Sequence, residues 1–259
     1  MKIKYICLLL TLTLLCLFTV TAYANEDDWY VETVESKSSP EGGIHGSVDM
    51  NYTMDTRDMN RFTLNTLLFL PYGFSYSNFF HLNSQMAVGG GNFDVNDLYH
   101  EQNLWWAPYK PIPLDVATQL QLISGVNNDQ VRFGLRWRIS DTPWIKVLCE
   151  KIHLFASVQY HPLQTDFNSS PGWGQSLEYV YRMQIMPQMF NDRLYIGGFV
   201  DHNLDFGTPA AGNNHNIVAE TQLGFRAYGN LNAIIEYRYS DYDVKRQGIA
   251  FGAEYVVNF

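Results

Sequence analysis

Cysteine is scarce in this chain, and long apolar runs are missing from all but its N-terminal part. Cys7 and Cys16 lie before residue 25, so Cys149 is the only cysteine in the remainder. A single cysteine excludes an intrachain disulfide. No run after Ala24 approaches the roughly 20 apolar residues that a membrane-spanning helix needs. If this chain crosses a membrane, it must therefore do so with strands.

The first 24 residues have the pattern of a secretory signal peptide. Lys2 and Lys4 precede an apolar run from residue 6 to residue 20, and the small-x-small pattern Ala22-Tyr23-Ala24 follows. The alternative is an N-terminal membrane helix, for which this apolar run is short. We therefore expect cleavage after Ala24. The predicted organisation is a signal peptide at 1–24, an acidic segment at 25–42 and one domain at 43–259.

Positive charge is also scarce. The 17 lysines and arginines include Lys2 and Lys4, so cleavage leaves 15 basic residues against 26 acidic ones, a net charge of −11. Nucleic acids are bound by basic surfaces. The composition therefore gives no reason to expect a nucleic-acid partner.

The last eleven residues, 249–259, alternate between two kinds of side chain. One row is Ile249, Phe251, Ala253, Tyr255, Val257 and Phe259, and the other is Ala250, Gly252, Glu254, Val256 and Asn258. A period of two residues predicts a strand with two different faces. An apolar row of this kind would be a poor edge strand in a soluble protein, because exposed edges aggregate. This stretch resembles the final strand of bacterial outer-membrane β-barrels, which alternates in this way and ends in Phe.

The resemblance implies an all-β fold: a closed antiparallel transmembrane β-barrel with an up-and-down meander. Twelve segments of suitable length, close to the 9–11 residues that a tilted strand needs, support it: 43–53, 61–70, 74–84, 97–107, 113–123, 130–140, 152–162, 175–186, 193–203, 216–226, 231–240 and 247–259. Longer and shorter connections alternate, as they do in such barrels. The exception among the short links is 141–151, which is long enough for a helical turn. With an even number of strands, both ends of the barrel and the segment 25–42 would be periplasmic.

The segment 130–140 shows the two faces most clearly. Val131, Phe133 and Trp137 would face lipid, while Arg132, Arg136 and Arg138 would face the lumen. An arginine on the lipid face costs about 2–4 kcal/mol at mid-depth. The same alternation places a set of charged side chains in the lumen: Arg132, Arg136, Arg138, Asp115, Glu178, Arg182, Asp201, Glu220, Arg226, Glu236, Arg238 and Glu254.

Two hypotheses compete for these lumen charges. Folding neighbouring strands together sets Glu220 opposite Arg238, Gln222 opposite Glu236, and Asp115 opposite Arg138. Such pairs would satisfy buried charges in a narrow barrel. Alternatively, in a round barrel Arg132 and Arg136 would look across the lumen toward Glu236 and Glu254. Basic and acidic walls that face each other would orient polar solutes at a constriction.

A polar row is predicted on the lipid face of the first strands. Register puts Thr66 beside Asn78, and Asn78 beside Gln102, if the even positions of 97–107 face outward. The alternative parity would turn Tyr99, Glu101, Asn103 and Trp105 outward and expose a charge. Amides without partners are costly in lipid. The row therefore predicts a contact between barrels in a homo-oligomer.

The function expected from the resemblance is a channel in the outer membrane of a Gram-negative bacterium, passing small polar or charged solutes by diffusion. Outer-membrane lipid and the barrel-assembly machinery, reached through the C-terminal strand, would be its partners. One alternative is a lipid-acting barrel enzyme, but His81 and Ser84 have the wrong spacing for the His-x-Ser signature of such enzymes. The other is a structural barrel whose lumen is blocked by Phe155, Tyr195 and Phe199. We expect no catalytic residue, no cofactor and no metal, since the histidines form no ligand cluster.

Overall fold

A computed structural model describes residues 43–85, 95–109, 111–123, 129–166, 174–205 and 214–259. The predicted segments 1–24 and 25–42 lie outside the described residues and stay predictions. Twelve strands form: β1 (His45–Asp55), β2 (Met59–Phe69), β3 (Phe74–Gln85), β4 (Val95–Trp106), β5 (Leu114–Ile123), β6 (Gln130–Arg138), β7 (Leu154–Asp166), β8 (Gly174–Gln184), β9 (Leu194–Asp205), β10 (Asn214–Tyr228), β11 (Leu231–Ser240) and β12 (Gln247–Asn258).

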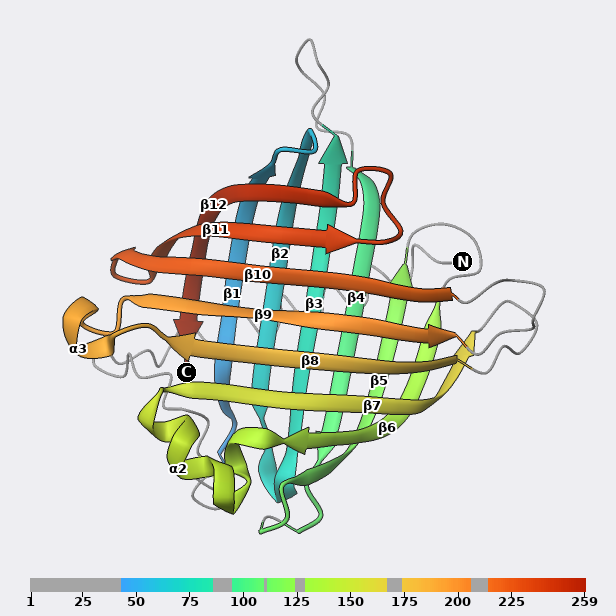
Figure 1. Cartoon of the computed structure of the whole chain (residues 1–259), viewed down its shortest axis with the longest axis vertical. Coiled ribbons are helices and arrows are strands. Elements are labelled where there is room, and N and C mark those ends of the chain that lie inside the picture. The colour runs from blue at the N-terminus through green and yellow to red at the C-terminus, as the bar shows by residue number, and fades with distance from the viewer. Residues whose placement is uncertain (1–42, 86–94, 110, 124–128, 167–173, 206–213) are drawn as a thin grey trace.

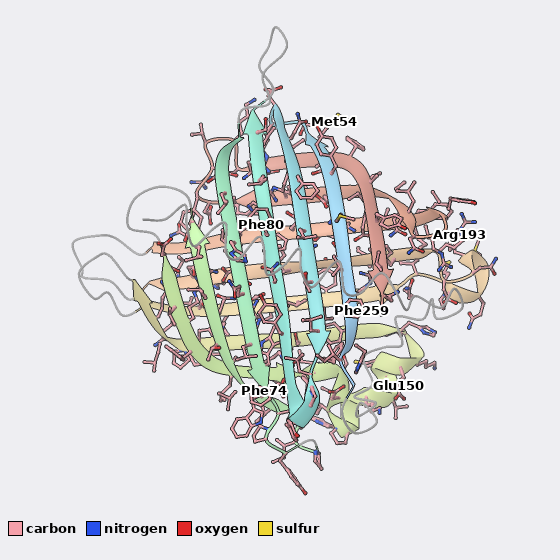
Figure 2. The ribbon with its side chains drawn as sticks, turned by 180° about the vertical axis from the view of Figure 1, so that it is seen from behind. Met54, Phe74, Phe80, Glu150, Arg193 and Phe259 are labelled. Carbon is pink, nitrogen blue, oxygen red and sulfur yellow. The ribbon has the colours of Figure 1, made fainter. Side chains whose placement is uncertain are left out.

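The strands close into one antiparallel barrel. Each strand pairs with its neighbours in the chain, and β12 pairs with β1 to complete the ring. At this seam, the Gly46 N–H donates to the Phe259 carbonyl at 2.8 Å and the Phe259 N–H donates to the Gly46 carbonyl at 3.0 Å, so Phe259 lies beside β1 (Figure 2). The prediction of a closed twelve-stranded meander is confirmed.

The barrel wall has an apolar outside and a polar inside, because successive side chains of a strand point to opposite faces. On β6, Phe133 and Leu135 are 46% and 52% exposed, whereas Arg132 between two outward residues is 2% exposed. On β12, Phe251 is 50% exposed and Glu254 is 3% exposed. A band of exposed large apolar side chains is stable in apolar surroundings such as lipid or a protein partner.

The strands are steeply tilted around the barrel. Figure 1 shows strands β7–β11 crossing in front of strands β1–β5 at a steep angle, so the two groups form opposite walls. Side chains from these walls meet across the interior. Phe79 of β3 and Phe199 of β9 lie on opposite sides of the strand order, yet their ring centroids are 6.1 Å apart. Long side chains therefore contact one another across the lumen.

Short helical elements gather at one end of the barrel, here called the turn end. They are η1 (Pro71–Gly73), η2 (Ile139–Asp141), α2 (Pro143–Lys151) and α3 (Pro187–Phe190). The helical turn expected within 141–151 is α2. Among the described helices, none is both long and apolar enough to cross a membrane. The opposite end, the loop end, carries the connections β1–β2, β3–β4, β5–β6, β7–β8, β9–β10 and β11–β12.

Candidate functional site: the barrel lumen

One cavity of about 2000 Å³ occupies the interior of the barrel. Its lining includes Arg57 and Asp243 at the loop end and Tyr72 and His153 at the turn end. The cavity therefore extends from one rim of the barrel to the other. Its walls combine apolar and aromatic surface with the amides, hydroxyls and charges that the inward rows of the strands carry.

Most of the charged residues selected from the sequence line this cavity: Arg132, Arg136, Arg138, Glu178, Arg182, Asp201, Glu220, Arg238 and Glu254. Asp115 and Glu236 lie deeper in the wall, each 1% exposed, where Arg136 and Arg238 cover them. Arg226 lies outside the cavity lining, near the end of β10. Its Nη2 donates to the Asn191 carbonyl at 3.1 Å, beside α3, so its placement in the lumen was wrong.

The predicted register holds between β10 and β11 and fails between β5 and β6. Glu220 lies opposite Arg238 and Gln222 opposite Glu236, as expected from the tight turn between β10 and β11. Asp115 lies opposite Arg136 in the register and not opposite Arg138, although the Arg138 Nε is still 3.6 Å from the Asp115 Oδ1. The Arg136 Nε donates to the Asp115 Oδ2 at 2.7 Å. The β5–β6 connection is longer, so it does not fix the register. The observed partner of Asp115 therefore lies two positions before the predicted one on β6.

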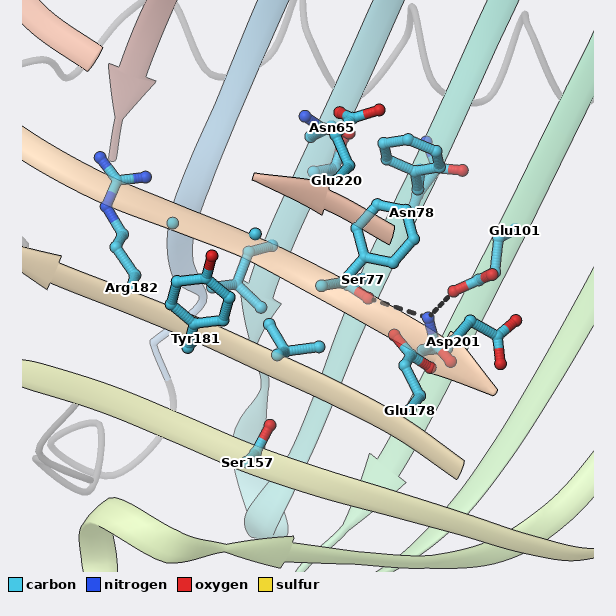
Figure 3. A pocket seen from close by; sticks show the side chains of 18 of the residues that line it. Asn65, Ser77, Asn78, Glu101, Ser157, Glu178, Tyr181, Arg182, Asp201 and Glu220 are labelled. Atoms are coloured by element: carbon cyan, nitrogen blue, oxygen red, sulfur yellow. Dashed lines mark hydrogen bonds between the residues drawn. The ribbon is translucent and has the colours of Figure 1, made fainter. Parts of the chain in front are cut away.

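Three carboxylates converge in the lumen near the middle of the walls. Figure 3 shows Glu101 of β4, Glu178 of β8 and Asp201 of β9 close together, with Arg182 at the other side of the pocket. The sequence analysis named Glu178 and Asp201 but missed Glu101. The signal was available, since the favoured parity of 97–107 turns Glu101 inward.

Neutral donors hold two of these carboxylates. Glu101 accepts hydrogen bonds from the Tyr99 hydroxyl at 2.5 Å, Asn103 Nδ2 at 2.8 Å and Gln121 Nε2 at 3.0 Å. Glu178 Oε2 accepts hydrogen bonds from Gln119 Nε2 at 3.0 Å and from Gln159 Nε2 at 2.9 Å. Such donors stabilise a carboxylate without cancelling its charge.

A second carboxylate group lies toward the turn end. Glu254 of β12 accepts hydrogen bonds from the Tyr195 hydroxyl, from Asn232 Nδ2 at 2.8 Å and from Gln222 Nε2 at 3.2 Å. Asp49 of β1, which the sequence analysis also missed, accepts from Asn65 Nδ2 at 2.7 Å. The Arg182 guanidinium stacks on the Tyr195 ring, with its Cζ 4.0 Å from the ring centroid.

The loop end of the lumen holds a network of ion pairs. Arg238 bonds to Glu236, and its Nε lies 3.1 Å from the Glu220 Oε2. Glu220 also pairs with Arg61 Nη1 at 2.9 Å. Asp55 pairs with Arg57 Nη2 at 2.7 Å and with Arg238 Nη1 at 3.4 Å. Here guanidinium and carboxylate groups neutralise each other.

The strands β6 and β12 lie six steps apart in the ring, as expected, but the arginines of β6 contact nearer strands. Arg132 reaches β9, where its Nη1 lies 3.4 Å from the Asp201 Oδ2 and its Nη2 donates to the Asn203 Oδ1 at 2.7 Å. Arg136 stacks on Trp105, with its Cζ 3.9 Å from the ring centroid. These contacts take the place of the predicted approach to Glu236 and Glu254.

Aromatic rings narrow the middle of the cavity. Phe79 makes edge contacts with Tyr99 and Phe199, at centroid distances of 6.0 and 6.1 Å. His81 stacks on Tyr99 at 5.0 Å. Phe155, Tyr195 and Phe199 all line the cavity, but Tyr195 is engaged by Arg182 and Glu254, so Phe199 is the ring that meets the opposite wall.

The predicted polar row has the expected register, although Thr66 and Asn78 are also among the residues that line the cavity. Thr66 pairs with Asn78, and Asn78 pairs with Gln102. The inward row of β4 includes Tyr99, Glu101, Asn103 and Trp105, so the alternative parity is excluded. The amides have partners within the barrel, however. Asn78 Oδ1 lies 2.5 Å from the His100 Nε2, and the Tyr76 hydroxyl donates to the Gln102 Oε1 at 3.4 Å.

A Ser–His contact occurs in the wall, between His161 of β7 and Ser176 of β8. The His161 Nδ1 and Ser176 Oγ are 3.2 Å apart. Both residues are 0% exposed, so a substrate has no access to this hydroxyl. Among the described residues, no group of three or more His, Cys, Asp or Glu side chains has the arrangement of a metal site.

Outside the strands, two carboxylates show shifted pKa values. Asp241, just beyond β11, accepts hydrogen bonds from the Ile217 N–H at 2.8 Å and the Tyr239 hydroxyl at 2.7 Å. These bonds lower the pKa of the Asp241 carboxyl, the backbone N–H contributing most. Burial raises the pKa of Asp141 in η2.

Comparison with known proteins finds likeness of structure alone. No protein-family model matches the sequence, and no curated protein matches it. Among solved structures, the KdgM porin aligns with 16% identity over 81% of this chain and 98% of its own, at a TM-score of 0.48. The NanC porin aligns with 12% identity over 82% and 98%, also at 0.48. An outer membrane channel from Pseudomonas putida F1 aligns with 12% identity over 85% and 96%, at 0.39. At these scores the function has to be argued from the lumen.

Proposed function

We propose that this chain is a channel in the outer membrane of a Gram-negative bacterium, through which small polar or charged solutes diffuse passively. The observation that carries the proposal is the cavity of about 2000 Å³, with charged and amide side chains in its walls, whose lining reaches both rims of a closed barrel. An apolar exterior around a polar interior suits a barrel in lipid. Rings of charged side chains around such a lumen are the usual basis of solute selection.

The cavity has a constriction, and this supports a channel for small solutes. Phe79 and Phe199 meet across its middle at 6.1 Å between ring centroids, and Arg132 of β6 bridges to Asp201 of β9, three strands along the ring. The same contacts favour a second candidate, a structural barrel with a closed lumen. The two candidates differ in whether ions pass.

Current through a planar lipid bilayer tests the channel. We expect steady open-channel current from the mature protein and a larger single-channel conductance from Phe199→Ala, because that substitution removes the ring that meets Phe79. Tyr228→Ala is the matched control, since Tyr228 is 85% exposed at the turn end and its loss should leave conductance unchanged. A silent bilayer would favour the structural barrel, and phospholipid hydrolysis in detergent would favour an enzyme.

The partners proposed for this barrel follow from its location. Outer-membrane lipid would contact the exposed apolar band, and the barrel-assembly machinery would engage β12, the strand that closes the barrel. A homo-oligomer through the row of Thr66, Asn78 and Gln102 stays a proposal. Crosslinking through Asn78→Cys in membranes tests it, with Tyr255→Cys on the outer face of β12 as control, and absence of a dimer band would count against it.

A further inference from the structure

The lumen is lined by more negative than positive groups. Its described lining contains seven arginines and eleven aspartates and glutamates, a difference of four negative charges, and no lysine. Asp115 and Glu236, which lie behind Arg136 and Arg238, add to the negative side. Because a low-dielectric wall focuses the field of such charges into the lumen, the excess acts on any ion that enters.

Most arginines of the lumen already have a carboxylate partner. Arg57, Arg61, Arg132, Arg136, Arg138 and Arg238 each have a carboxylate oxygen within 3.4 Å. Among the ion pairs of the described residues, Arg182 takes no part, and its guanidinium instead covers the Tyr195 ring. An anion that enters the lumen therefore meets guanidinium groups that already have counter-charges.

The negative groups of the lumen are not neutralised in the same way. Glu101, Glu178, Glu254 and Asp49 are held by hydroxyl and amide donors, and none of them takes part in an ion pair among the described residues. Figure 3 shows Glu101 and Glu178 converging with Asp201 on one side of the pocket. Arg132 is the cation that reaches this group, through Asp201 at 3.4 Å.

We propose that the lumen selects cations over anions, with Glu101 and Glu178 at its main selecting point. This inference rests on the channel function proposed above and specifies its substrate class: small inorganic cations and small organic solutes with net positive charge, such as those bearing an amino or guanidino group. The amide scaffold holds the two carboxylates in fixed positions. A passing cation supplies the counter-charge that the protein itself does not.

The reversal potential of the mature protein across a KCl gradient in a planar bilayer tests this selectivity. We expect K⁺ to be preferred over Cl⁻. Glu101→Gln with Glu178→Gln keeps the shape and one acceptor oxygen of each side chain, and should lower the K⁺/Cl⁻ permeability ratio by roughly fiftyfold. Each unit charge at a separation of about 7 Å in water favours K⁺ about threefold and disfavours Cl⁻ about threefold, which changes the ratio about sevenfold.

Arg182→Gln should act in the opposite direction and raise the permeability ratio by about sevenfold, since it removes the lumen arginine that takes no part in the ion pairs of the described residues. This variant leaves the Glu101–Glu178 group intact, so it tests the proposal even if the double variant fails to fold. The matched control is Asp58→Asn, because Asp58 pairs with Lys245 on the exposed loop end and should leave the ratio unchanged.

The outcomes separate the two proposals. Steady current with a preference for Cl⁻, or a ratio that Glu101→Gln with Glu178→Gln does not lower, overturns the cation selectivity while the channel stands. Absence of current from the wild-type protein overturns the channel and the selectivity together.

Discussion

Arg238 is the cation on which the loop-end network depends, and removing it tests how much the ion pairs of the lumen contribute to stability. Its guanidinium bonds to Glu236, lies 3.1 Å from Glu220 and 3.4 Å from Asp55, and donates to the Thr53 hydroxyl at 2.9 Å. In Arg238→Met, Glu220 keeps its pair with an arginine of β2, and Asp55 keeps its own. Glu236, which is 1% exposed, loses its only ion-pair partner among the described residues.

An uncompensated buried charge of this kind costs about 3–5 kcal/mol, so the free energy of unfolding of Arg238→Met should fall by that amount. Methionine keeps the apolar stem, which limits the loss from packing. Urea titration of the barrel folded in lipid vesicles, followed by tryptophan fluorescence, measures the change. Adding Glu236→Gln to the same chain removes the orphaned charge and should restore about 2 kcal/mol.

The single variant Glu236→Gln completes the cycle. It leaves Arg238 with two carboxylates and should cost about 1 kcal/mol, the order of one hydrogen bond. If Arg238→Met is no more stable when Glu236→Gln is added, the loss does not come from an unpaired Glu236. The reasoning that assigns the lumen charges to ion pairs would then be refuted.

Two further predictions follow from other contacts. A Cβ at Gly224 would lie 2.1 Å from the Tyr195 Cζ, whereas a Cβ at Gly197 would lie 3.2 Å from its nearest atom, the Tyr181 carbonyl oxygen. Gly224→Ala should therefore lower the free energy of unfolding by about 1–3 kcal/mol. The same urea titration should show a smaller loss for Gly197→Ala. Because the folded pKa of Asp241 is lowered, its contribution to stability is present above its ordinary pKa of 3.8 and should disappear as the pH falls through the lower, folded value. In that pH range, hydrogen exchange of the Ile217 N–H should become faster in the wild-type protein relative to the Asp241→Asn variant. If the ratio of the two exchange rates does not change with pH, the prediction is contradicted.

The strands and their faces were predictable because hydrocarbon and water are opposite environments. The alternation of Arg132, Arg136 and Arg138 with apolar residues permits one orientation of β6, and the structure has it. Registers were predictable where the turn is short, as between β10 and β11. The pairing of Asp115 was not, because the longer β5–β6 connection allows several alignments that keep the same parity.

Contacts across the lumen could not be predicted from alternation, since they depend on the shape of the closed barrel. Counting strands around a circle directed Arg132 toward Glu236 and Glu254, whereas its guanidinium reaches Asp201 of β9, three strands along the ring. Glu101 was missed for a related reason. Its inward direction follows from the parity of β4, but its convergence with Glu178 and Asp201 requires knowledge of which walls approach each other.

The seam between Gly46 and Phe259 has a consequence for the order of assembly. It joins the first and last strands of the barrel, which are far apart in the sequence, so loop closure makes it an expensive and slow contact to form. Until β12 docks, β1 and β12 each have a free edge, and free edges pair readily with other chains. The protein therefore gains its protection from aggregation in a single late step, and loss of its final residues would expose two edges at once.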